Sequence, residues 1–113
     1  MLWMLPQAIV MEMTLTGQFL PIERLRELGF VNHVELTPDA VRTRALSIAQ
    51  VIEANAPLSV RAGKASLLAA AALGAERGLQ EACRIYKPVY SSHDAQEGMQ
   101  AFAEKRKPLW RAS

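Results

Sequence analysis

The sequence has one cysteine, no glycine-rich loop, little net charge and no long hydrophobic run. One cysteine cannot form an internal disulfide, so the 113-residue chain is not a secreted disulfide scaffold. A formal net charge of +2 argues against a helical DNA-binding regulator, and we expect no nucleic-acid partner. The six glycines are scattered and form no G-x-G-x-x-G phosphate-binding loop.

The N-terminal stretch is apolar and contains no positive charge, since the first basic residue is Arg24. A signal peptide needs a positive n-region, and a membrane-spanning helix needs about 20 apolar residues. Neither class fits, because Pro6, Gln7 and Glu12 interrupt the run. We therefore expect the edge of a core here, no membrane association, and a location in the cytoplasm or an organelle matrix.

Hydrophobic residues make up 50% of the chain, and its mean hydropathy of +0.04 is high for a soluble domain of this size. The length allows one domain at most, which we assign to residues 1–113. So short a chain buries only about two-thirds of its unfolded surface. The composition therefore predicts apolar faces that the chain cannot cover alone.

Prolines and glycines divide the chain into helix-length segments. The strongest helix start is Thr37-Pro38-Asp39, which combines a capping hydroxyl, a proline at the first helical position and an acid in the first turn. The β-branched residues after Phe30 allow one short strand near residues 31–34. The rest is predicted to be all-α, with helices over residues 6–15, 21–28, 38–55, 57–74, 79–90 and 93–106.

Apolar residues fall on one face at helical spacing over residues 38–55, and the next two helices carry small or apolar stripes as well. In the alanine-rich helix that ends between Gly74 and Gly78, the stripe predicts close approach of a neighbouring helix. It consists of Ala65, Leu68, Ala69 and Ala72. In the next helix, Cys83 falls on the apolar face, which predicts a buried structural thiol rather than a nucleophile.

The histidines and carboxylates have no spacing typical of a catalytic or metal site. His33 and His93 lack ligand partners at i+3 or i+4, so we predict no metal site. Glu12 is expected to face solvent or to be paired. The close pairs, Glu23 with Glu27 and Asp94 with Glu97, lie in the first turns of helices. Capping or salt bridges explain both pairs.

A cluster of positive and aromatic residues lies near the C-terminus. It contains Phe102, Lys105, Arg106, Lys107, Pro108, Trp110 and Arg111. On a helix, Phe102 and Lys105 are three apart and share a face, where a ring beside an ammonium could hold a purine and a phosphate. The alternative is that these cations only stabilise the negative end of the helix dipole.

Three segments resemble the enoyl-CoA hydratase/isomerase (crotonase) superfamily. They are LTGQFLPIERLRELGFVNHV, ANAPLSVRAGKASL and the closing SSHDAQEGMQAFAEKRKPLW. Their order and spacing fit, and the resemblance extends from about Leu5 onward. It implies the C-terminal helical region of that fold, which forms trimers that often pair into hexamers. The spiral of β-β-α repeats that precedes this region in the family has no counterpart here.

The resemblance also implies what this chain lacks and what it keeps. The family's acid/base glutamates and oxyanion hole lie upstream, so we assign no catalytic residue and no cofactor. Phe102 and Lys105 match an aromatic and a lysine that reach the adenine and phosphate end of coenzyme A in a neighbouring subunit. We expect a portion of an acyl-CoA enzyme that is inactive alone. The alternative is a stand-alone helical self-association module.

Overall fold

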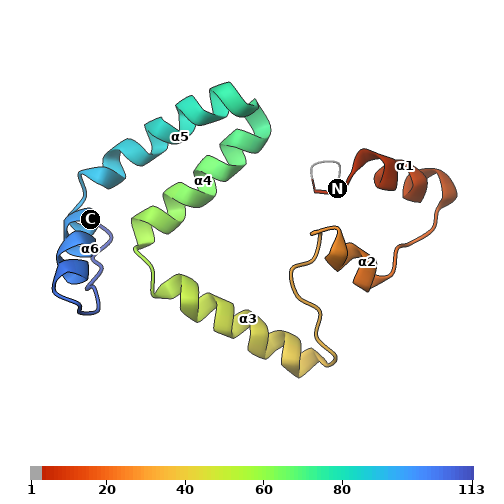
Figure 1. The fold of residues 1–113 in the computed structure, drawn as a ribbon, viewed down its shortest axis with the longest axis horizontal. Helices are drawn as coiled ribbons and strands as arrows, with labels where there is room; N and C mark the ends of the chain where they lie inside the picture. Colours follow the sequence, from red (N-terminus) through yellow and green to blue (C-terminus); the bar gives the residue numbers. More distant parts are fainter. Residues whose placement is uncertain (1–3) are drawn as a thin grey trace. The chain divides into compact units, whose positions relative to one another are not determined.

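The computed structural model describes residues 4–113 as six helices without a strand in that range (Figure 1). The helices are α1 (Gln7–Thr16), α2 (Ile22–Glu27), α3 (Pro38–Glu53), α4 (Pro57–Leu73), α5 (Ala75–Tyr90) and α6 (His93–Ala103). The all-α prediction is therefore confirmed. The chain divides into two compact units, one up to Leu46 and the other Ser47–Ser113.

The short strand expected near residues 31–34 is wrong. This stretch forms bends and irregular backbone, and no other extended segment in residues 4–113 pairs with it. A lone strand leaves its backbone groups unsatisfied. Here the amides of Phe30 and Val31 turn back and donate to the carbonyl of Leu25 at 2.9 and 3.4 Å.

In the first unit, local residues set the helix ends as predicted. α1 ends at Gly17, whose φ of 68° is left-handed and whose amide donates to Met13 O at 3.0 Å. Gly29, with φ 75°, follows the end of α2. The Thr37 hydroxyl accepts the amide of Ala40 at 3.2 Å and caps the start of α3. These ends depend on residues within one turn of each terminus.

In the second unit, α4 and α5 form an antiparallel hairpin, seen side by side in Figure 1. The closest approach is between Gly78 and Ala70, because a Cβ at position 78 would lie 2.5 Å from the Ala70 Cα. Gly78 was expected in the turn, but α5 begins at Ala75 and buries it. The face of α4 against α5 also differs from the predicted stripe, since its buried residues are Ala62 and Ser66.

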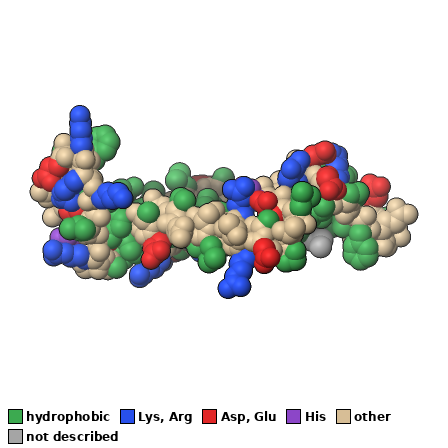
Figure 2. Space-filling view, turned by 90° about the horizontal axis from the view of Figure 1, so that it is seen from below, with side chains coloured by type: hydrophobic (Ala, Val, Ile, Leu, Met, Phe, Trp, Pro, Cys, Tyr) green, Lys and Arg blue, Asp and Glu red, His purple; other side chains and the backbone are tan. Residues whose placement is uncertain are grey.

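Many large apolar side chains are exposed, as the hydropathy predicted. The buried hydrophobic residues among those described are Leu5, Ala62 and Ala101, whereas Leu67 is 75% and Tyr90 is 76% exposed. Figure 2 shows hydrophobic side chains spread over the visible surface. Cys83, expected to be buried, is exposed. Within residues 4–113, no helix has the length and apolar character needed to cross a membrane.

Candidate functional site

The candidate site lies where α6 ends and the C-terminal segment folds back. Figure 2 shows Lys and Arg side chains gathered around this end of the second unit, at the left. α6 begins at the buried Ser92, whose hydroxyl accepts the amide of Ala95 at 3.1 Å and donates to Val89 O at 2.6 Å. Ser92 is therefore the N-cap of α6. It fixes the helix that carries the site.

Two buried carboxylates on α6 hold the C-terminal segment. Asp94 accepts the amides of Arg111 at 2.7 Å and Ala112 at 2.9 Å. Glu97 accepts two bonds from the Arg106 guanidinium, at 2.6 and 3.1 Å, and the amide of Leu109 at 2.7 Å. The sequence predicted salt-bridge or capping roles for this pair. The structure gives Glu97 a salt bridge and uses both residues to anchor the chain end.

This arrangement keeps Glu97 ionised. The Arg106 hydrogen bond, followed by that of the Leu109 amide, lowers the pKa of Glu97 to about 2. The same contact raises the pKa of Arg106 above its usual range. A general acid needs a pKa near the working pH. Glu97 is therefore a structural ion and not a proton donor at neutral pH.

Trp110 connects the C-terminal segment to the junction between α3 and α4. Its indole Nε1 donates to Ala54 O at 2.9 Å. The ring also lies against Gly98 of α6, where a Cβ would be 3.4 Å from the indole Cη2. The sequence placed Trp110 in the basic and aromatic cluster. The structure shows it half-buried against the second unit, which leaves Phe102 as the fully exposed aromatic residue of that cluster.

Phe102 and Lys105 are close along the backbone but do not share a helix face as predicted. α6 ends at Ala103 rather than Arg106, so Lys105 lies beyond the helix with a left-handed φ of 53°. Its amide donates to Phe102 O at 3.2 Å. The early end has a physical cause, because Arg106 must turn back to reach Glu97. The Phe102 side chain is 88% exposed.

The other titratable candidates do not converge. Glu12 is exposed, as expected for a solvent-facing acid, and His33 is exposed as well. The His93 Nδ1 lies 3.9 Å from an Asp94 oxygen, at the start of α6. Across residues 4–113, no three His, Cys, Asp or Glu side chains are grouped to hold a metal ion. Of the candidates chosen from the sequence, Phe102 and Lys105 are both exposed and lie close along the backbone at the end of α6.

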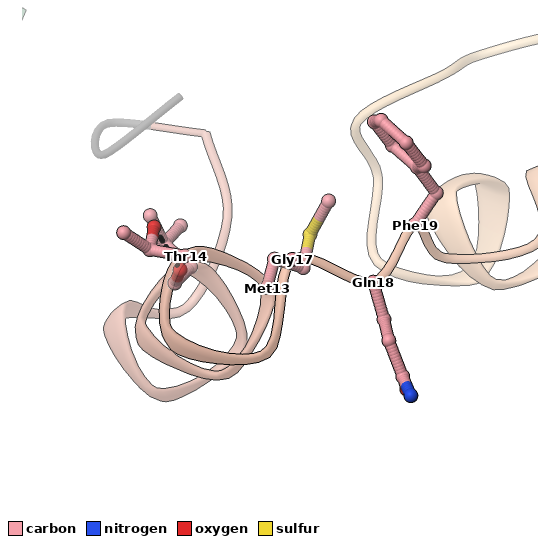
Figure 3. A pocket seen from close by; sticks show the side chains of 6 residues that line it. Met13, Thr14, Gly17, Gln18 and Phe19 are labelled. Carbon is pink, nitrogen blue, oxygen red and sulfur yellow. Dashed lines mark hydrogen bonds between the residues drawn. The ribbon is translucent and has the colours of Figure 1, made fainter.

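A shallow depression in the first unit carries no such chemistry. It has a volume of about 270 Å³ and is lined by Val10, Met13, Thr14, Gly17, Gln18 and Phe19. Met13 and Phe19 point to one side of the Gly17 turn, and Gln18 points away from them (Figure 3). The Thr14 hydroxyl already donates to Val10 O at 2.7 Å. The depression is an apolar surface without a titratable group.

Comparisons with known proteins identify what the chain resembles. Residues 2–113 match the family model for enoyl-CoA hydratase/isomerase. The chain is 38% identical over 112 residues to carnitinyl-CoA dehydratase of Citrobacter koseri, covering 96% of this chain and 42% of that protein. It is 33% identical over 109 residues to (E)-benzylidenesuccinyl-CoA hydratase of Thauera aromatica, with the same coverage.

A solved structure gives the same result. The enoyl-CoA hydratase of Mycobacterium tuberculosis H37Rv is 40% identical, with a TM-score of 0.87 over 97% of this chain and 43% of that one. The chain thus spans less than half the length of the relatives it matches.

Proposed function

This chain belongs to the enoyl-CoA hydratase/isomerase family, and we propose on that premise that it is a C-terminal portion of an acyl-CoA enzyme. In this proposal it supplies helix faces for self-association and a contact to coenzyme A, but no catalytic group. The observation that carries it is the use of the two buried carboxylates, Asp94 and Glu97, to hold the chain's own C-terminal segment. Neither carboxylate is available to a substrate.

The contact with coenzyme A is supported by the exposed pair at the end of α6. Phe102 offers an aromatic face and Lys105 an ammonium, which suit an adenine ring and a phosphate. Carnitinyl-CoA dehydratase and (E)-benzylidenesuccinyl-CoA hydratase are both named for CoA thioesters, so an acyl-CoA is the ligand class that we propose. We expect the protein in the cytoplasm or an organelle matrix. In this proposal, residues outside this chain determine which acyl group is bound and whether the reaction is a hydration or an isomerisation.

We predict that the purified 113-residue chain does not hydrate crotonyl-CoA. A family reaction needs an oxyanion hole and an acid/base group, and the carboxylates described here are exposed or bound to the chain itself. The assay follows the ultraviolet absorbance of the conjugated thioester, with the M. tuberculosis enoyl-CoA hydratase as the positive control. Turnover well above the enzyme-free blank would overturn the claim that this chain lacks catalytic groups.

A stand-alone self-association module is the second candidate, and the exposed apolar residues favour it. Leu67, Leu79 and Tyr90 of the α4–α5 hairpin are each at least 66% exposed. Such patches are typical of protein interfaces. We predict a trimer or hexamer of the isolated chain by multi-angle light scattering, insensitive to salt because the contacts are apolar. A well-behaved monomer at the same protein concentration would count against self-association.

A further inference from the structure

Lys105 takes a left-handed backbone conformation, for which glycine is used at the ends of α1 and α2. Among the described residues, Ala112, with φ 58°, is the other non-glycine residue with a positive φ. The residue that follows the end of α1 is Gly17, with φ 68°, and Gly29 follows the end of α2 with φ 75°. At the end of α6, the corresponding residue is Lys105, with φ 53°. A side chain on Cβ makes this conformation unfavourable, so helices usually end here with glycine. The left-handed conformation costs free energy at Lys105, so other contacts must hold the residue in it.

The backbone on both sides of Lys105 is fixed to α6. The amide of Glu104 donates to Gln100 O at 2.9 Å, and that of Arg106 donates to Ala101 O at 3.0 Å. The Arg106 side chain adds a second restraint, because its Nε donates to Glu104 at 2.6 Å and its two terminal nitrogens donate to Glu97. The residues flanking Lys105 thus hold it in the left-handed conformation.

The held residue is itself available to a ligand. Within residues 4–113, no ion pair involves Lys105, although Arg106 next to it is bound to two carboxylates. The exposed Phe102 lies one turn earlier, joined to Lys105 by a backbone hydrogen bond. The fixed backbone determines the direction in which the Lys105 side chain leaves the chain. It therefore limits where the ammonium lies relative to the Phe102 ring.

We propose that Arg106, clamped by Glu97 and Glu104, is a positioning residue that holds Lys105 left-handed so that its ammonium meets an anionic group of coenzyme A beside Phe102. This inference rests on the proposed coenzyme A contact. Arg106 acts through Lys105 and does not touch the ligand. Glycine would suit this backbone conformation but has no side-chain ammonium to place beside an anionic group.

The test is a double-mutant cycle on coenzyme A binding, measured by NMR titration of the whole chain. Lys105→Ala should raise the dissociation constant about tenfold, as for loss of a charged hydrogen bond. Arg106→Lys keeps the charge but loses the forked contact to Glu97, and it should weaken binding about threefold. In the Lys105→Ala background, Arg106→Lys should have no further effect. The matched control Lys107→Ala removes an adjacent charge and should weaken binding less than twofold.

Two further measurements separate positioning from a merely structural role. The coupling between the amide and α protons of residue 105 reports φ, and in Arg106→Lys it should show loss of the left-handed conformation. Lys105→Gly should raise the melting temperature by about 4 °C, because strain is relieved, while it weakens coenzyme A binding as Lys105→Ala does. This opposition between stability and binding is specific to a strained functional residue.

The outcomes are distinguishable. If Arg106→Lys leaves affinity unchanged, or weakens binding equally in both backgrounds, the positioning role is overturned and the coenzyme A contact stands. If Lys105→Ala leaves the affinity of a chain that does bind coenzyme A unchanged, both Lys105 and its positioning are excluded from the site. If the unmodified chain binds no coenzyme A, the proposed contact fails and the positioning role fails with it.

Discussion

Replacing Gly78 with valine is expected to force α4 and α5 apart and to destabilise the second unit by about 3 kcal/mol. A Cβ at position 78 would lie 2.5 Å from the Ala70 Cα, 3.1 Å from its Cβ and 3.3 Å from its backbone nitrogen. Contacts below 3 Å with backbone cannot be relieved by a rotating side chain. The two helix axes must separate, which removes the packing around Ala62 and Ser66 as well.

The measurement is urea denaturation followed by far-ultraviolet circular dichroism, with Gly98→Ala as the matched control. Gly98 is also a glycine inside a helix, but its added Cβ would meet the Trp110 ring at 3.4 Å, an ordinary contact. Alanine also favours a helix over glycine by about 1 kcal/mol, so the control should be neutral or stabilising. If Gly78→Val were as stable as the unmodified chain, the close approach of the two helices would be wrong.

The helix ends that could be predicted from sequence are those set by neighbouring residues. Thr37 caps α3, and Gly17 and Gly29 follow α1 and α2. The features that could not be predicted depend on residues far apart. A glycine so soon after Gly74 is typical of a turn, which is why Gly78 was expected there. The turn instead ends at Gly74, and Gly78 packs against Ala70 of the preceding helix. Only the tertiary contact gives that glycine its role.

The candidate site shows the same division. Phe102 and Lys105 could be selected from residue type, spacing and family resemblance, but the geometry between them could not. The ion pair between Glu97 and Arg106 spans nine positions and ends α6 three residues early. The bond from Trp110 to Ala54 spans 56 positions. The available signal was an acid inside the helix and an arginine at its expected end. Hydrophobic periodicity does not predict whether two such residues pair.

Release of the C-terminal segment on acidification is the second large effect that we expect. The pKa of Glu97 is lowered to about 2 from the usual 4.5, so its ionised form stabilises the folded segment. That contribution is complete above pH 4.5 and is lost as the pH falls from 4.5 toward 2. Glu97→Gln should remove the contribution at every pH. Both changes remove the negative charge that binds Arg106 and weaken the hydrogen bonds that Glu97 accepts from Arg106 and from the amide of Leu109.

Trp110 reports the release, because its indole is bonded to Ala54 O only while the segment is folded back. The chain has two tryptophans, so the titration uses a Trp3→Phe background. We expect a fluorescence change between pH 4.5 and 2 in the parent, and the released signal already at pH 7 in Glu97→Gln. Hydrogen exchange at the Leu109 amide should accelerate about tenfold or more in that variant.

Glu81→Gln is the matched control for this release. Glu81 also binds an arginine, Arg84, at 2.6 Å, and that hydrogen bond lowers its pKa, but the pair lies on one exposed face of α5. Its loss should leave both the Trp110 signal and the acid transition unchanged, since surface pairs contribute little. An acid transition that persists in Glu97→Gln would mean that another group holds the segment. Asp94 is buried and accepts the amides of Arg111 and Ala112. Asp94→Asn would then test whether Asp94 is the anchor.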